Sequence, residues 1–170
     1  MTEGTKNILD QIGGTPLVPI TALNRNRNVQ ILAKLESFNP GGSIKDRPAL
    51  YMIEAAEKSG ELTRDKIILE ATSGNTGIGL ALVAAVKGYR ILLTMSEAVS
   101  EERVKILKAL GAEVAFTPAH LGTDGAIEHG YQLLREHPGT YWLADQFNNE
   151  ANWMAHYYGT ATEIWEQTGG

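Results

Sequence analysis

The chain has 170 residues, of which 43% are hydrophobic and 21% are charged. This is the composition of a globular domain with a packed core, and it excludes an intrinsically disordered chain. The sequence contains no cysteine, which excludes a disulfide scaffold, a cysteine nucleophile and a thiolate metal site. The formal net charge of −5 argues against nucleic acid as the main partner.

Two features of the chain bear on membranes and secretion. The longest apolar run, residues 78–86, is far shorter than the ~20 residues that a helix needs to cross a bilayer. Residues 1–10 contain an early acidic residue and no apolar stretch, so they do not resemble a secretory signal. We therefore expect a cytoplasmic protein with no membrane partner.

Apolar residues recur along the chain with the periods of strands and helices in turn. From the N-terminus, strands are predicted over residues 16–20, 29–35, 67–71, 90–95, 113–117 and 141–144, and helices over 46–59, 75–87, 101–110, 123–136 and 149–167. This alternation predicts an α/β fold in three layers, with a parallel sheet that helices cover on both faces. Ligands of such sheets bind beyond the carboxyl ends of the strands, so the loops there are candidate sites.

The first candidate loop, residues 39–47, follows a predicted strand and leads into a predicted helix. Its sequence is Asn-Pro-Gly-Gly-Ser-Ile-Lys-Asp-Arg, and the pair of glycines allows a ligand to approach the backbone closely. Lys45 lies near the positive end of the helix dipole, which disfavours an ammonium, and a neutral lysine can act as a nucleophile or a general base. The alternative is an ordinary surface lysine after a turn, and composition alone does not decide between them.

The second candidate loop follows the predicted strand at 67–71. Residues 72–76 read Thr-Ser-Gly-Asn-Thr, which places hydroxyl and amide groups beside the free N–H groups of a helix start. Such a loop suits a phosphate or a carboxylate, and a helix cap with glycines for close packing is the competing explanation. A nicotinamide dinucleotide loop is a weaker alternative, because the spacing Gly74-x-x-Gly77-x-Gly79 differs from Gly-x-Gly-x-x-Gly.

The third candidate loop, residues 145–149, follows the last predicted strand. Its Gln146 amide would face the same crevice as the other two loops and could donate a hydrogen bond to a carboxylate without adding charge. A polar turn that caps the next helix is the competing explanation. The four histidines show no spacing typical of metal ligands, so no metal site is predicted.

Together, the three loops resemble those of the cysteine synthases (O-acetylserine sulfhydrylases) and cystathionine β-synthases, which are fold-type II pyridoxal-phosphate enzymes. Residues 39–47 match the lysine motif of that family, and residues 72–77 match its substrate loop. Residues 12–17, Ile-Gly-Gly-Thr-Pro-Leu, resemble the opening strand of the family, and residues 145–149 and 163–170 look most like the B-type bacterial cysteine synthases. The resemblance runs over essentially the whole chain and corresponds to the N-terminal half of such an enzyme.

The resemblance implies a role for each matched residue. Lys45 would form a Schiff base with pyridoxal 5'-phosphate and later move the Cα proton of the substrate. Asn75 would hydrogen-bond the phenolic oxygen of the cofactor. The carboxylate of the substrate would be held by Thr72, Ser73, Gly74, Asn75 and Thr76, with Gln146 on its opposite side.

The reaction implied by the resemblance is a β-replacement. Acetate would leave O-acetyl-L-serine, and sulfide would add to an aminoacrylate intermediate to give L-cysteine. Chemistry like that of cystathionine β-synthase or serine dehydratase stays open, as does a non-catalytic module that binds an anion or a partner protein. Family members are commonly homodimers.

The resemblance also implies a division of the chain. Residues 1–38 would contain strands that pair with the C-terminal domain of the family, residues 39–158 would form its smaller, mobile α/β domain, and residues 159–170 would begin the crossover to the C-terminal domain. The family's loop for the cofactor phosphate lies beyond the equivalent of Gly170. The 170 residues alone are therefore expected to bind the cofactor weakly and to be inactive.

Overall fold

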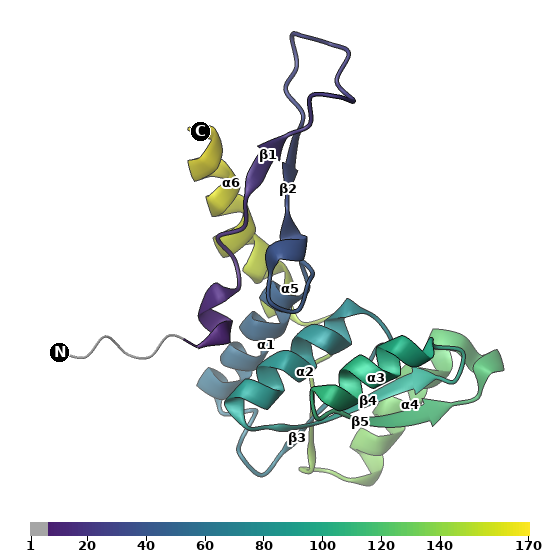
Figure 1. The fold of residues 1–170 in the computed structure, drawn as a ribbon. Helices are drawn as coiled ribbons and strands as arrows, with labels where there is room; N and C mark the ends of the chain where they lie inside the picture. The colour runs from purple at the N-terminus through teal and green to yellow at the C-terminus, as the bar shows by residue number, and fades with distance from the viewer. Residues whose placement is uncertain (1–6) are drawn as a thin grey trace.

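The computed structural model describes residues 7–170. Residues 1–6, which belong to the stretch considered for a secretory signal and to the predicted segment 1–38, lie outside the described residues. Figure 1 shows a layered α/β body, with a hairpin and the C-terminal helix extending away from it. In the part of the chain that is described, no helix is both long enough and apolar enough to span a membrane.

Strands and helices alternate along the chain. The strands are β1 (Leu17–Pro19), β2 (Leu32–Lys34), β3 (Ile67–Ala71), β4 (Arg90–Ser96), β5 (Glu113–Thr117) and β6 (Tyr141–Leu143). The α-helices are α1 (Asp46–Ser59), α2 (Asn75–Lys87), α3 (Glu101–Ala109), α4 (Gly122–Glu136), α5 (Glu150–Ala155) and α6 (Ala161–Thr168). Short 3-10 turns η1 (Ile8–Gln11), η2 (Glu36–Phe38) and η3 (Ala119–Leu121) and the π-helical turn η4 (His156–Thr160) complete the chain.

The main sheet is parallel and has the strand order β5-β4-β3-β6. Helix α4 packs on one face of this sheet, whereas α2 packs on the other face and is itself covered by α1 (Figure 1). Every residue of β3 is buried, because the strand lies inside the sheet and both of its faces are covered. The predicted three-layer α/β fold with a parallel sheet is confirmed.

The strand order creates a switch point beside β3. The chain runs from β3 to β4 and then to β5 in one direction, and it returns to place β6 on the other side of β3. The loops that follow β3 and β6 are therefore neighbours at the carboxyl edge of the sheet, which is where ligands bind in open α/β sheets, and the surface between them is called the crevice below.

The predicted strand over residues 29–35 is too long, since β2 contains only Leu32–Lys34. It pairs antiparallel with β1 in a separate two-stranded sheet. The residues before β2 belong to a loop in which the Asn24 side chain binds the backbone N–H of Asn26 and the Asn26 side chain binds that of Asn28. Such local side-chain bonds favour a loop over a strand at residues 24–28, just before β2.

The helix predicted over residues 149–167 is present over residues 150–168, but it contains a π-helical turn, η4, between α5 and α6. Gly159 of this turn lies against Arg47, and a Cβ atom added there would be 3.5 Å from Arg47 Nη1. The wider turn admits the guanidinium and places Glu163 of α6 in contact with it. The hydrophobic period of a single helix contains no sign of this interruption.

Candidate active site

The loop after β3 and the segment after β6 meet across the crevice. The hydroxyl of Thr76, in the first turn of α2, donates a hydrogen bond of 2.7 Å to Oε1 of Gln146, which follows β6. Thr76 is buried and Gln146 is half-buried, so this contact forms one wall of the crevice rather than its rim. Two of the predicted site residues, 70 positions apart in the sequence, are thus in direct contact.

The start of α2 leaves donors available to a ligand. Gly74 occupies the N-cap position, and no side chain caps the helix. Within the loop, the backbone N–H of Gly74 bonds to Thr72 Oγ1 at 3.2 Å, and Arg103 Nη1 bonds to the carbonyl of Ser73 at 3.2 Å. The side chain of Asn75 is exposed and forms no hydrogen bond within residues 7–170. Uncapped N–H groups at the positive end of a helix favour a carboxylate or a phosphate.

Lys45 lies immediately before α1, next to the first turns of α2. The two helices approach closely here, because a Cβ atom added to Gly79 would be 3.0 Å from the carbonyl oxygen of Lys45. Lys45 is half-buried, and within residues 7–170 its Nζ atom forms no hydrogen bond or ion pair. This amine is therefore partly shielded from water and is not held by a carboxylate.

An ionic cluster packs against the lysine loop and consists of Lys34, Glu36, Arg47 and Glu163. Arg47 is only 4% exposed and binds Glu36 through Nε at 2.7 Å and Nη2 at 2.9 Å. It also binds Glu163, through Nη1 at 2.6 Å and Nη2 at 2.8 Å, and donates to Thr15 Oγ1 at 3.2 Å. Lys34 adds an ion pair of 2.6 Å to Glu163. The cluster thus connects β2, η2, α1 and α6 two residues away from Lys45.

Charge states in this cluster follow from its contacts. Burial opposes ionisation of Glu163, but hydrogen bonds from Arg47 and Lys34 prevail and lower the pKa of its carboxyl to about 2.

Burial lowers the pKa of His156 in η4, and the positive charges of Lys45 and Arg47 act in the same direction. His156 therefore lies within electrostatic reach of Lys45, and it is a neighbour that the sequence pattern did not identify.

A second neighbour missing from the predicted site is Glu70, in β3. Its side chain is buried and accepts a hydrogen bond of 2.9 Å from Nε2 of Gln146. Burial raises the pKa of Glu70 to about 7, although hydrogen bonds from Gln146 oppose the shift. The available signal was a glutamate inside the apolar strand sequence Ile-Ile-Leu-Glu-Ala.

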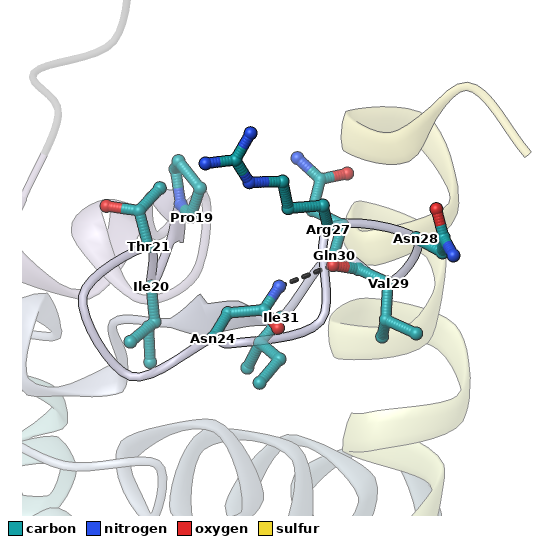
Figure 2. Close-up of a pocket in the computed structure, with 9 residues that line it drawn as sticks. All are labelled: Pro19, Ile20, Thr21, Asn24, Arg27, Asn28, Val29, Gln30 and Ile31. Carbon is teal, nitrogen blue, oxygen red and sulfur yellow. Dashed lines mark hydrogen bonds between the residues drawn. The ribbon is translucent and has the colours of Figure 1, made fainter.

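Of two cavities of similar size, one adjoins the crevice and the other lies in the β1–β2 hairpin. One, of about 410 Å³, is lined by Ser73, Ser96, Arg103 and Thr123 and adjoins the loop after β3. The other, of about 440 Å³, is enclosed by the loop between β1 and β2, where the Asn24 side chain donates to the carbonyl of Val29 (Figure 2). None of the predicted site residues lines the second cavity.

Comparison with known proteins identifies the family. The model of the family described as "Pyridoxal-phosphate dependent enzyme" matches residues 8–170. The chain belongs to the pyridoxal-phosphate-dependent enzyme family. The resemblance noted in the sequence is therefore confirmed, and within this family the fold is that of the fold-type II enzymes.

Members of the pyridoxal-phosphate-dependent enzyme family share both sequence and structure with the chain. The cysteine synthase of Aquifex aeolicus is 50% identical over 99% of the chain and 52% of its own length. The cystathionine beta-synthase of Dictyostelium discoideum is 47% identical over 96% of the chain and 33% of its own length. The structure of the cysteine synthase of Entamoeba histolytica superposes with a TM-score of 0.92 at 46% identity, covering 96% of the chain and 49% of that enzyme. The chain thus spans about half the length of the cysteine synthases it matches.

Proposed function

We propose that this chain is part of a pyridoxal-phosphate-dependent cysteine synthase that forms L-cysteine from O-acetyl-L-serine and sulfide. The observation that carries the proposal is the Thr76–Gln146 hydrogen bond, which closes a donor-lined crevice at the switch point of the sheet. Lys45 lies at the start of α1, with its backbone carbonyl against Gly79 of α2, and its amine is free of ion pairs within residues 7–170. The 50% identity to a cysteine synthase supports the choice of reaction.

The residues of the crevice suit pyridoxal phosphate and an amino-acid substrate. Bound pyridoxal phosphate would supply an aldehyde for an amine and an electron sink for the charge that develops at the substrate Cα. Lys45 would hold the cofactor covalently and, once displaced by the substrate amine, would take the Cα proton on its Nζ atom. Asn75, whose amide is exposed and free of hydrogen bonds within residues 7–170, would orient the cofactor through its phenolic oxygen.

The substrate carboxylate would be held without an arginine. The uncapped start of α2 offers N–H groups and a positive dipole end, beside which Thr72, Ser73, Gly74 and Thr76 would line the carboxylate site. Gln146 would contact the carboxylate from the β6 side. Binding would draw residues 39–158 inward as a mobile domain and exclude water from the reacting atoms, while residues 159–170 would lead into a second domain.

Covalent trapping tests the role of Lys45. The protein is incubated with pyridoxal 5'-phosphate, reduced with borohydride and mapped by peptide mass spectrometry. Because the reduction makes the bond irreversible, even a weakly bound cofactor is captured. The pyridoxyl group is expected on Lys45 and is expected to be lost in Lys45→Arg. Lys105→Arg, at a side chain that is 74% exposed, is the matched control and should leave the labelling unchanged. Equal labelling of Lys45→Arg and the unmodified protein would refute the assignment.

A second candidate reaction is favoured by the 47% identity to a cystathionine beta-synthase. The native protein should be assayed in parallel with O-acetyl-L-serine plus sulfide and with L-serine plus homocysteine. The proposal expects cysteine from the first pair at a kcat/KM at least tenfold above that for cystathionine from the second. The reverse ratio would assign the other reaction, and turnover of neither pair would leave a non-catalytic module as the better account.

A further inference from the structure

Glu70 is a charged residue in the interior of the sheet. It is 3% exposed and lies opposite Leu93 of β4, and its neighbours in β3 are apolar. Burying a carboxylate costs free energy unless hydrogen bonds compensate, so an acid inside a sheet requires hydrogen-bond partners. The proposed reaction assigns Glu70 no part.

Both carboxylate oxygens of Glu70 face Gln146. Oε1 accepts a hydrogen bond of 2.9 Å from Gln146 Nε2, and Oε2 accepts one of 3.4 Å from the Gln146 backbone N–H. The other end of the same amide, Oε1, accepts the 2.7 Å bond from Thr76. The three side chains therefore form one chain of hydrogen bonds that runs from the sheet interior to the loop after β3.

The charge state of Glu70 fixes the direction of this chain. An ionised carboxylate can only accept, so it requires Nε2 of Gln146 to face Glu70 and Oε1 to face Thr76. The Thr76 hydroxyl proton is then committed to Gln146, and the second Nε2 proton is the one left for a ligand. A protonated Glu70 could instead donate to Oε1, which would turn Nε2 toward Thr76 and release the Thr76 hydroxyl proton to the crevice.

We propose that Glu70 is a positioning residue that sets the orientation of the Gln146 amide, and thereby which donor the crevice presents to a substrate carboxylate. The inference rests on the proposed function, since it assumes that a carboxylate binds between Gln146 and the loop after β3. Glu70 itself does not touch the substrate and acts through Gln146.

The surroundings of Glu70 allow both charge states near neutral pH. The titratable groups that face it are Asp145, in the segment after β6, and Tyr131 of α4. The negative charge of Asp145 reinforces the effect of burial on the Glu70 pKa, which is about 7. A cavity of about 160 Å³ lined by Glu70, Tyr131 and Asp145 offers a route for proton exchange with water.

Nuclear magnetic resonance of the side-chain amides tests the coupling directly, without cofactor or substrate. In the unmodified chain the ¹⁵N and ¹H shifts of the Gln146 NH₂ group are expected to change with pH through an inflection near pH 7. Glu70→Gln should abolish this inflection, and Glu61→Gln, at an exposed position, should leave it unchanged. Thr76→Val removes the other bond of the amide but keeps Glu70, so it should retain the inflection. A Gln146 amide that does not titrate, or that titrates equally in Glu70→Gln, would overturn the proposal.

Steady-state kinetics of the cofactor-loaded native protein test the consequence for binding. The KM for O-acetyl-L-serine should vary with pH through the same inflection, while kcat varies much less, and Glu70→Gln should flatten the KM profile. Glu70→Met, which can neither accept nor donate strongly, should raise KM about fivefold, the effect of one lost hydrogen bond. An unchanged KM profile in Glu70→Gln would refute the positioning role. Absence of any turnover in the unmodified protein would instead contradict the proposed function, and the amide titration would still decide the coupling of Glu70 to Gln146.

Discussion

Two glutamates of this protein are shielded from bulk water, and their carboxyl pKa values shift in opposite directions. Glu70 stands at the crevice end of β3, where its partner is the neutral amide of Gln146, and burial raises its pKa to about 7. Glu163 stands in the ionic cluster behind the lysine loop, where burial is outweighed by Arg47 and Lys34 and the pKa falls to about 2. The comparison shows that the partner, rather than burial alone, decides whether a carboxylate is held charged.

The two regions also differ in what they connect. The ionic cluster joins segments that are distant in the sequence, since Arg47 and Glu163 are 116 positions apart, and it fixes the backbone around Lys45. The crevice network joins the two loops that would hold the substrate and contains no cation among Glu70, Gln146 and Thr76. A charged cluster suits a rigid support, whereas a neutral network with one titratable member can change its hydrogen-bond direction.

The largest expected effect comes from removing the cation of the ionic cluster. Arg47→Ala leaves Glu36 and Glu163 facing each other without their shared partner, and loss of one member of a buried ion pair costs about 3–5 kcal/mol. Urea denaturation followed by circular dichroism measures the change in the free energy of unfolding. Arg90→Ala is the matched control, because the Arg90–Glu113 pair is exposed and such pairs contribute under about 1 kcal/mol. Similar losses in both variants would show that the cluster provides no more support than a surface pair.

The next effect concerns the crevice. The folded-state pKa of Glu70 is raised from 4.5 to about 7, so between these values the folded state binds a proton that the unfolded state has lost. Stability therefore falls as pH rises through this window, and the shift corresponds to about 3 kcal/mol. Glu70→Gln should remove the fall, so that its stability relative to the unmodified protein increases from pH 5 to pH 8. Urea midpoints at both pH values measure this difference, and a constant difference would contradict the raised pKa.

The sequence predicts the features of this fold that depend on local patterns, but not those that depend on pairings between distant residues. The bounds of α1, β3 and α2 match the predicted ranges, because apolar period, turn residues and glycine ends are local signals. The sequence points to Lys45, Thr76 and Gln146 because they belong to loops that follow strands, and a local pattern can locate such loops. The π-helical turn at His156–Thr160 depends on the fit of Arg47, and the role of Glu70 depends on a partner 76 positions away. Such pairings exist only in the folded chain, so no local pattern encodes them.

The smallest expected effect concerns Glu163, whose contribution to stability depends on pH in the direction opposite to that of Glu70. The pKa of Glu163 is lowered from 4.5 to about 2, so its contribution to stability is present above pH 4.5 and is lost as pH falls toward 2. Glu163→Gln should therefore destabilise the protein at pH 7. The carboxylate is 21% exposed and its bonds are partly screened, so the loss should be about 1–2 kcal/mol.

The penalty of Glu163→Gln should shrink by pH 3, whereas the stability of Glu70→Gln relative to the unmodified protein should rise above pH 5. Two identical chemical changes, each removing one carboxylate, would then have opposite pH dependences. Urea titrations of both variants from pH 3 to pH 8 give the two curves. Curves that change with pH in the same direction would mean that burial sets the charge state in both regions, and the distinction between a charged support and a titratable crevice network would be lost.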